Sequence, residues 1–219
     1  MKPQDSIFLQ SMRHTVLNQI AADYSISPRV IEAMKAVPRH YFVDYSQQEE
    51  SYDDRPLPIA SGQTISQITT VALQTHLLDA KPGMKVLEIG AGSGYQAAIL
   101  VKLDCIVFSI ERIEELYEVA QANVAKLDPA PDVNFVFGDG FEGLPQNAPF
   151  DRILVTCGAT SVPNQLVGQL AIGGKMVVPV GVKLQEMLVI ERTDEDQFST
   201  TSAGHYSFVP MLTGVVRKK

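Results

Sequence analysis

The chain has 219 residues, of which 45% are hydrophobic and 20% are charged, a composition typical of a soluble globular protein with one main core. Its formal net charge of −7 argues against nucleic acid as a partner, because proteins that bind a phosphate backbone usually present a basic face. The N-terminal residues lack the apolar stretch of a secretory signal, and Lys102 and Asp104 interrupt the apolar run from Ala97 to Ile110. We therefore expect a cytoplasmic protein that does not span a membrane.

The two cysteines, Cys105 and Cys157, are expected to be free thiols. In the strand assignment below they lie beside two non-adjacent strands, further apart than the roughly 7 Å between Cα atoms that a disulfide tolerates. Unpaired thiols fit a reducing compartment. The four histidines show no ligand spacing with either cysteine, so the sequence predicts no metal site.

The N-terminal part predicts helices that precede the main sheet. Apolar residues recur at every fourth position between Asp5 and Ala22, which indicates a helix. Ser27-Pro28 is a typical helix start, and Pro38 should end that second helix because the residue before a proline disfavours helical angles. We expect residues 39–43 to be extended, residues 45–54 to be a loop and residues 69–78 to be a third helix.

The segment from Arg55 to Gln67 is apolar, yet its two prolines and one glycine exclude a long regular element. Binding residues are often found on loops of this kind. We therefore expect the segment to contribute to a binding site.

From Lys85 onward the pattern is a regular alternation of strands and helices. Residues 85–89 fit a buried strand, three glycines follow at positions 90, 92 and 94, and a helical pattern begins at Tyr95. A strand, a glycine turn and a helix in this order form a nucleotide-type binding corner. Repeated units of this kind predict an open parallel sheet with helices on both faces. The other expected strands are 106–110, 133–137, 153–156, 175–179, 186–192 and 206–210, and the other expected helices are 114–127 and 163–170.

Three acidic residues, Glu88, Glu111 and Asp139, lie at or near the ends of successive strands. A carboxylate beside the glycine turn repels a pyrophosphate but attracts a cationic ligand. Glu111, about 20 residues after the turn, can hold both hydroxyls of a ribose, and Asp139 is placed for an adenine amino group. S-adenosylmethionine carries a sulfonium and an ammonium group but no phosphate, so this pattern favours a methyltransferase.

Two other interpretations of these residues stay open. Aspartate and glycine are common in turns and caps, so each acidic residue taken singly is explained as well by structure as by binding. An NAD-dependent enzyme is the least favoured alternative, because Tyr95 stands where the dinucleotide pattern requires glycine.

The chain resembles the protein-L-isoaspartate O-methyltransferase family from about Val37 to Pro210. The most specific motif is Gly62-Gln63-Thr64-Ile65-Ser66-Gln67, since most class I methyltransferases share the glycine corner. The other matching segments are Val37-Pro38-Arg39 with Phe42, Pro58-Ile59, Val86-Leu87-Glu88-Ile89-Gly90, Gly138-Asp139-Gly140, Pro149-Phe150-Asp151 and Phe208-Val209-Pro210.

The resemblance implies the class I S-adenosylmethionine-dependent methyltransferase fold, an α/β, Rossmann-like, seven-stranded, mostly parallel sheet with helices on both faces and an N-terminal helical extension. Residues 1–80 would supply the helices and a substrate loop, and residues 81–219 the S-adenosylmethionine-binding core, within one compact domain. The family methylates the α-carboxylate of L-isoaspartyl, and more slowly D-aspartyl, residues in damaged proteins as a repair step. We expect a monomer that needs no metal, nucleic acid or membrane.

The resemblance also implies roles for individual residues. Ser66 matches the residue usually assigned to catalysis. The substrate would contact Pro58, Ile59, Thr64, Ser66, Val209 and Pro210. The cofactor would contact Thr64, Ile65, Glu88, Gly90, Ala91, Gly92, Ser93, Gly94, Glu111, Asp139 and Gly140.

The expected chemistry needs no general base, because a carboxylate nucleophile with an ordinary pKa near 3.9 is already ionised at neutral pH. Transfer from a sulfonium neutralises both partners, so a dry pocket favours it. We hypothesise that the Ser66 hydroxyl orients one oxygen of the acceptor without cancelling its charge. The alternative is that Ser66 only caps the helix that follows it.

Three positions depart from the family pattern. Ala60 stands where glycine is usual, Ile68 replaces a usual proline, and Cys157 sits where alanine is common. Ala60 restricts the backbone, and Ile68 leaves a free N–H at a helix start. Ala60 and Ile68 therefore leave open an inactive cofactor-binding or interaction module. A class I methyltransferase that acts on a small molecule also stays open, since it explains the three acidic residues, although it leaves residues 62–67 and Val209-Pro210 without a role.

Overall fold

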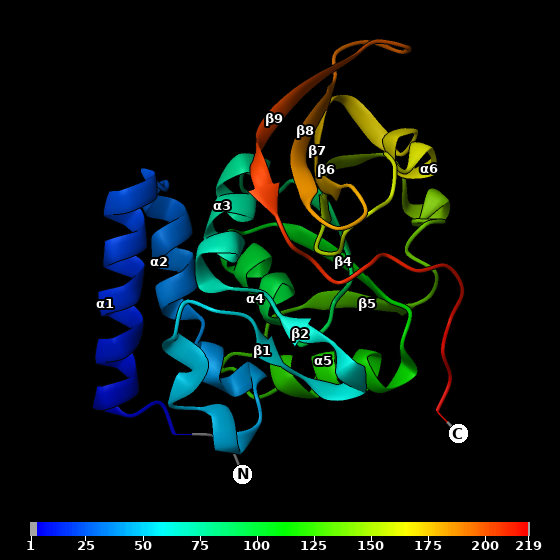
Figure 1. Ribbon diagram of the computed structural model, residues 1–219. Coiled ribbons are helices and arrows are strands. Elements are labelled where there is room, and N and C mark those ends of the chain that lie inside the picture. Colours follow the sequence, from blue (N-terminus) through cyan, green and yellow to red (C-terminus); the bar gives the residue numbers. More distant parts are fainter. Residues whose placement is uncertain (1–3, 219) are drawn as a thin grey trace.

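The computed structural model describes residues 4–218, and a seven-stranded sheet forms its centre (Figure 1). The strands of this sheet are β3 (Lys85–Ile89), β4 (Ile106–Glu111), β5 (Val133–Phe137), β6 (Phe150–Val155), β7 (Leu170–Val180), β8 (Gln185–Arg192) and β9 (Phe198–Tyr206). They lie in the order β5-β4-β3-β6-β7-β8-β9. The first five in this order are parallel, and β8 runs antiparallel to both β7 and β9. The predicted mostly parallel, seven-stranded sheet is confirmed.

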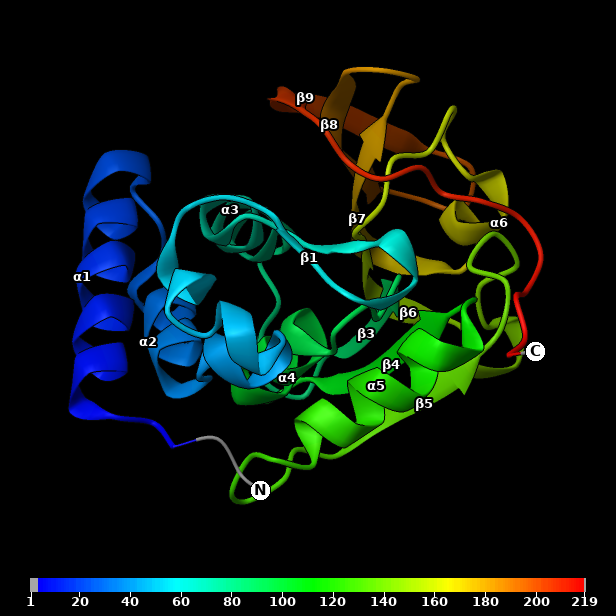
Figure 2. The same cartoon turned by 60° about the horizontal axis from the view of Figure 1, so that its bottom comes forward.

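Helices lie on both faces of the sheet but cover them unequally (Figure 2). Strand residues Val86 and Val107 share one core with the five longer helices, whereas Leu87 and Ile89 share the opposite core with one short helix. The longer helices are α1 (Ile7–Tyr24), α2 (Pro28–Ala36), α3 (Ile68–Leu78), α4 (Tyr95–Lys102) and α5 (Glu114–Val124), and the short one is α6 (Asn164–Val167).

Short elements fill the connection between α2 and α3 and one later loop. A two-stranded antiparallel hairpin pairs Leu57 with Ile65 and Pro58 with Thr64. Within residues 4–218, no helix combines the length and the apolar character that crossing a bilayer requires. The short elements are η1 (Arg39–Phe42), η2 (Tyr45–Gln47), η3 (Glu50–Tyr52), β1 (Leu57–Pro58), η4 (Ala60–Gly62), β2 (Thr64–Ile65) and η5 (Pro145–Asn147).

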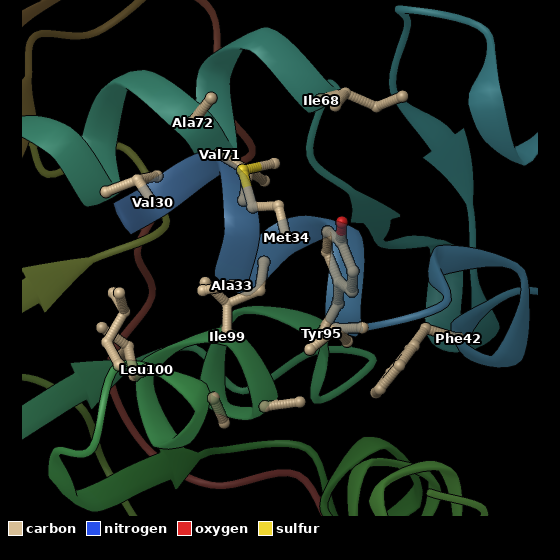
Figure 3. Close-up of a cluster of buried hydrophobic side chains, with 14 of the residues drawn as sticks. Val30, Ala33, Met34, Phe42, Ile68, Val71, Ala72, Tyr95, Ile99 and Leu100 are labelled. Carbon is tan, nitrogen blue, oxygen red and sulfur yellow. The ribbon is translucent and has the colours of Figure 1, made fainter. Parts of the chain in front are cut away.

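Helix α2 joins the N-terminal part to the main sheet, because it contacts both α3 and α4. Figure 3 shows Met34 of α2 among Val71 of α3 and Tyr95 and Ile99 of α4, and all four side chains are buried. Each such side chain contributes roughly 1.5–3 kcal/mol when it is fully buried. This packing fixes the start of α4 directly after the glycine turn, and it fixes α3 directly after the β1–β2 hairpin.

Two predictions for the connection after α2 are wrong. Residues 39–43 are not extended but form the 3₁₀ helix η1, and residues 45–54 contain η2 and η3. The reason is that Arg39 and His40 are buried here, where Arg39 Nε donates to Ser51 O at 2.8 Å and His40 Nδ1 lies 2.7 Å from the Tyr52 hydroxyl. A tight turn brings both side chains to these partners, whereas a strand would send them to opposite sides.

The predictions for the C-terminal elements need correction as well. The last strand is β9, which ends at Tyr206, so residues 207–210 do not form the predicted strand. Strand β9 is an edge strand with mostly exposed residues and therefore lacks an apolar pattern. The predicted helix 163–170 is only the four-residue α6, because Leu170 already begins β7, and α5 ends at Val124 rather than at residue 127.

Candidate active site at the carboxyl edge of the sheet

Three connected hollows lie where the β1–β2 hairpin faces the carboxyl ends of β3, β4 and β6, and both Thr64 and Thr156 line all three. The glycine-side cavity holds about 720 Å³ of space, including its open mouth, and is bounded by Glu111, Gly140 and residues 209–212. The polar pocket beneath the glycine turn is lined by Ser66, Gln74, Glu88, Ser93 and Gln96, among others. The outer groove opens on the other side of Ser66, toward Tyr24, Leu184 and Phe208.

At two positions of the glycine turn, the backbone takes angles that favour glycine over any other residue. Gly90 and Gly94 have φ angles of +94° and +85°. A Cβ atom on Gly90 would lie 2.7 Å from Thr156 Oγ1, and a Cβ atom on Gly94 would lie 2.9 Å from the Ala120 carbonyl oxygen. The backbone is therefore packed against Thr156 at Gly90, which lines the cavity, and against α5 at Gly94, so neither position has room for a side chain.

Glu111 lies at the end of β4 and faces the glycine-side cavity. Gly92 N donates to its Oε2 at 2.9 Å, and Ile113 N donates to its Oε1 at 3.0 Å. The neighbouring Arg112 also lines the cavity, but its Nε donates to Gly214 O at 2.8 Å, so its guanidinium is held by the C-terminal segment. The cavity thus presents a fixed carboxylate, which suits ribose hydroxyls and disfavours a pyrophosphate.

Glu88 is fully buried in β3 and lines the polar pocket. Ser109 Oγ donates to its Oε2 at 2.5 Å, while its Oε1 has no hydrogen-bond partner in residues 4–218. The pKa of this carboxyl is raised to about 8, mainly by burial and in part by the charge of Glu111, while the Ser109 hydrogen bond opposes the shift. A buried, unpaired acceptor is costly, so this site fits a ligand that brings a cation or a donor.

Asp139 is the one predicted acidic residue that the structure does not bring to the lining of these three hollows. Phe141 N donates to its Oδ1 at 2.9 Å, and Gly214 N donates to its Oδ2 at 2.5 Å. The next residue, Gly140, does line the glycine-side cavity. The Asp139 side chain therefore holds the C-terminal segment.

Most other predicted site residues meet at this edge. Ser66 lines both the polar pocket and the outer groove, and Val209 lines both the cavity and the groove. Pro58 belongs to the hairpin, where it pairs with Thr64, and the Ile59 side chain approaches Gly92, but neither residue is in the lining of the three hollows. Gly94 faces α5. The other predicted residues also line these hollows. Ile65, Ala91 and Ser93 line the polar pocket, Pro210 lines the glycine-side cavity, and Gly90 and Gly92 line both.

The alternative that Ser66 caps α3 is wrong. The N-cap residue of α3 is Gln67, and its side chain makes no capping hydrogen bond. Instead, Asp54 accepts from Thr69 N at 2.9 Å and from Thr69 Oγ1 at 2.6 Å. The Ser66 hydroxyl is thus not committed to the helix and is available at the junction of pocket and groove.

The departures from the family pattern leave this geometry intact. Ala60 keeps a negative φ, whereas the next two residues, Ser61 and Gly62, take positive φ angles. Ile68 begins α3 and is buried. Cys157 lines the cavity as a free thiol, and its burial raises the pKa of the thiol to about 12, so it stays protonated at neutral pH.

Three polar residues of the site were not singled out from the sequence. Thr156 donates its hydroxyl to Gly90 O at 2.8 Å, and Gln74 and Gln96 line the polar pocket. The only sequence signal for Thr156 is a polar residue directly after the apolar strand residues 153–155. Among residues 4–218, no group of three or more histidine, cysteine or acidic side chains could hold a metal ion.

A family model described as Protein-L-isoaspartate(D-aspartate) O-methyltransferase matches residues 10–216 of the chain. The chain belongs to this family. It is 44% identical over 203 residues to the protein-L-isoaspartate O-methyltransferase of Flavobacterium psychrophilum, with 93% of this chain and 95% of the relative covered. It is 45% identical over 216 residues to that of Methanopyrus kandleri, with 97% and 96% covered.

Solved structures agree with this family and with the predicted class I fold. A protein-L-isoaspartate O-methyltransferase superimposes with a TM-score of 0.82 at 29% identity, covering 90% of this chain and 65% of the longer one. A Plasmodium falciparum structure described as a putative enzyme of this kind in complex with S-adenosyl-L-homocysteine superimposes with a TM-score of 0.79 over 91% of this chain and 98% of that one. At 23% identity the second likeness shows the fold alone. Members of the family are S-adenosylmethionine-dependent enzymes of protein repair, as the sequence resemblance predicted.

Proposed function

We propose that this chain methylates the α-carboxylate of L-isoaspartyl residues, and of D-aspartyl residues, in damaged proteins at the junction of the three hollows. The observation that carries the proposal is the position of Ser66. It lies between an outer groove that is open to a polypeptide and a polar pocket under the glycine turn. A small-molecule methyltransferase would not need this open groove.

The residues of the inner hollows fit S-adenosylmethionine, which supplies a methyl group on a sulfonium when it is bound. Glu88, whose Oε1 lacks a partner in residues 4–218, would hold the ammonium group, and Glu111 would hold the ribose hydroxyls. Gly140 and Asp139 would bound the adenine end, since each carboxylate oxygen of Asp139 has a further lone pair. The other proposed cofactor contacts are Thr64, Ile65, Gly90, Ala91, Gly92, Ser93 and Gly94.

On the acceptor side, we propose that Ser66 orients the isoaspartyl carboxylate beside Thr64. Val209 and Pro210 would pair with the peptide backbone, and Pro58 and Ile59, at the end of β1, would add further contacts to the substrate. The chain itself then supplies orientation and a site from which water is excluded, which suits a reaction in which two opposite charges disappear.

The proposed division of labour places the substrate loop in residues 1–80 and the cofactor site in residues 81–219, within one compact domain. We propose that the chain acts as a monomer. The two free cysteines support a cytoplasmic location.

The decisive experiment is labelled methyl transfer to two peptides of one sequence that differ only in an isoaspartyl or an ordinary aspartyl linkage. We expect incorporation into the isoaspartyl peptide alone. Equal methylation of both peptides would contradict the repair function. Tight binding of S-adenosylmethionine without transfer to either peptide would instead identify an inactive cofactor-binding module.

A further inference from the structure

The outer groove continues beyond the reaction point into a recess that combines polar side chains, His205 among them, with a set of large apolar ones. Its described lining contains no aspartate, glutamate, lysine or arginine. Tyr24 at the end of α1 and Leu184 in the turn between β7 and β8 remain 49% and 60% exposed. Large apolar side chains at the mouth of a groove indicate a surface that a ligand covers. The apolar wall residues are Tyr24, Leu73, Leu184, Tyr206 and Phe208.

The far wall of this recess is held in place by contacts within the chain. The backbone at Phe208 is fixed, because Phe208 N donates a hydrogen bond to Gln185 Oε1 at 2.9 Å. The rings of Tyr206 and Phe208 lie 6.4 Å apart between centroids, and the Tyr206 hydroxyl donates to Ala203 O at 3.3 Å. A wall fixed in this way loses little conformational entropy when a side chain packs against it.

We propose that this recess binds an apolar or aromatic side chain of the substrate that flanks the isoaspartyl residue. The inference rests on the proposed function, because the damaged residue at Ser66 brings the next residues of the polypeptide into the groove. Ser66 and Thr64 line the recess and the reaction point alike, so the two sites are continuous. Against the apolar wall residues, a charged flanking residue would lose its water without gaining a polar partner from them.

The test is a series of isoaspartyl peptides in which one position on either side of the damaged residue is glycine, leucine, phenylalanine or glutamate. We expect kcat/KM for the leucine and phenylalanine peptides to exceed that of the glycine peptide by roughly tenfold on one side. Glutamate at that position should lower it below the glycine value. A flat profile on both sides would overturn the inference.

A matched pair of variants assigns the effect to the recess. Leu184→Ser should bring kcat/KM for the leucine and phenylalanine peptides down toward the glycine value. Val182→Ser changes a side chain of the same turn that is 80% exposed and outside the groove lining, so it should keep the wild-type profile. An unchanged profile in Leu184→Ser would also overturn the inference. If glycine-flanked peptides are methylated, either failure leaves the proposed function standing, whereas no methylation of any peptide contradicts that function itself.

Discussion

Gly214 N donates a hydrogen bond of 2.5 Å to the Asp139 carboxylate and so ties the C-terminal segment to the end of β5. This segment, residues 207–218, runs from β9 toward α5 and past the glycine-side cavity (Figure 1). It is also fixed at Met211, whose N donates to Gly158 O at 2.8 Å, and at Val216, whose N donates to Arg112 O at 2.8 Å. The wall that residues 209–212 give to the cavity thus depends on contacts on both sides of it.

Replacement of Asp139 by alanine should loosen this wall. We expect roughly tenfold weaker binding of S-adenosylhomocysteine by calorimetry, because a charge-assisted hydrogen bond is lost, together with faster proteolysis within residues 207–218. Glu118→Gln is the matched control, since it removes only the exposed ion pair with Lys218 and should change affinity less than about twofold. Weaker binding without faster proteolysis would mean that Asp139 acts only through the adenine.

Glu88 makes the stability of the unliganded protein fall with rising pH. Its pKa is about 8 in the folded protein, above the ordinary value of 4.5. Between these pH values the folded state keeps a proton that the unfolded state has released, so each step up in pH favours unfolding. Glu88→Gln should therefore raise Tm, by an amount that grows from pH 5 to about pH 8. A constant or negative difference across this range would contradict the assignment.

The same group should link cofactor binding to proton release. If Glu88 must be ionised to hold an ammonium group, the affinity of the wild-type protein for S-adenosylmethionine rises as the pH approaches about 8. Calorimetry in buffers of different ionisation enthalpy should detect the released proton. Glu88→Gln should bind more weakly and release no proton from this site; equal proton release in both proteins would exclude Glu88 as its source.

Ser66→Ala should separate acceptor orientation from cofactor binding. We expect kcat/KM for an isoaspartyl peptide to fall roughly 10- to 100-fold, because an orienting hydrogen bond is lost at the reaction point. The affinity for S-adenosylhomocysteine and the Tm should stay close to wild type. Ser61→Ala is the control in the same loop, since the Ser61 hydroxyl donates to Glu115 Oε2 at 2.6 Å and lies outside the hollows. Undiminished turnover in Ser66→Ala would remove Ser66 from the mechanism.

Asp54→Ala should weaken the start of α3 and the loop before it. Asp54 accepts from Thr69 N, Thr69 Oγ1 and Gln67 Nε2, so it serves as a helix cap from outside the helix. We expect a loss of about 1–2 kcal/mol in the free energy of unfolding and a higher KM for the peptide. Asp54→Asn keeps one acceptor oxygen and should therefore show a smaller loss of stability and a smaller rise in KM. An unchanged KM in Asp54→Ala would show that the loop holds its shape without this cap.

The glycine turn and Glu111 could be predicted because their signals are local: a strand, closely spaced glycines, a helix, and an acid at the next strand end. The role of Thr156 could not be predicted, because only the parallel pairing of β3 with β6 brings its hydroxyl to Gly90 O. Strand β9 was missed because an exposed edge strand needs no apolar pattern. The apolar residues 208–210 resembled a strand, but they are apolar because they line the cavity and the groove.

Val209 lines both the glycine-side cavity and the outer groove, whereas Phe208 lines only the groove and Met211 only the cavity. In the proposed assignment, one short stretch of chain therefore separates the entrance for the methyl donor from the entrance for the polypeptide. Both ligands can then be bound at the same time, as direct transfer of a methyl group requires. In this arrangement spent cofactor would leave through its own entrance and would not have to pass the bound polypeptide.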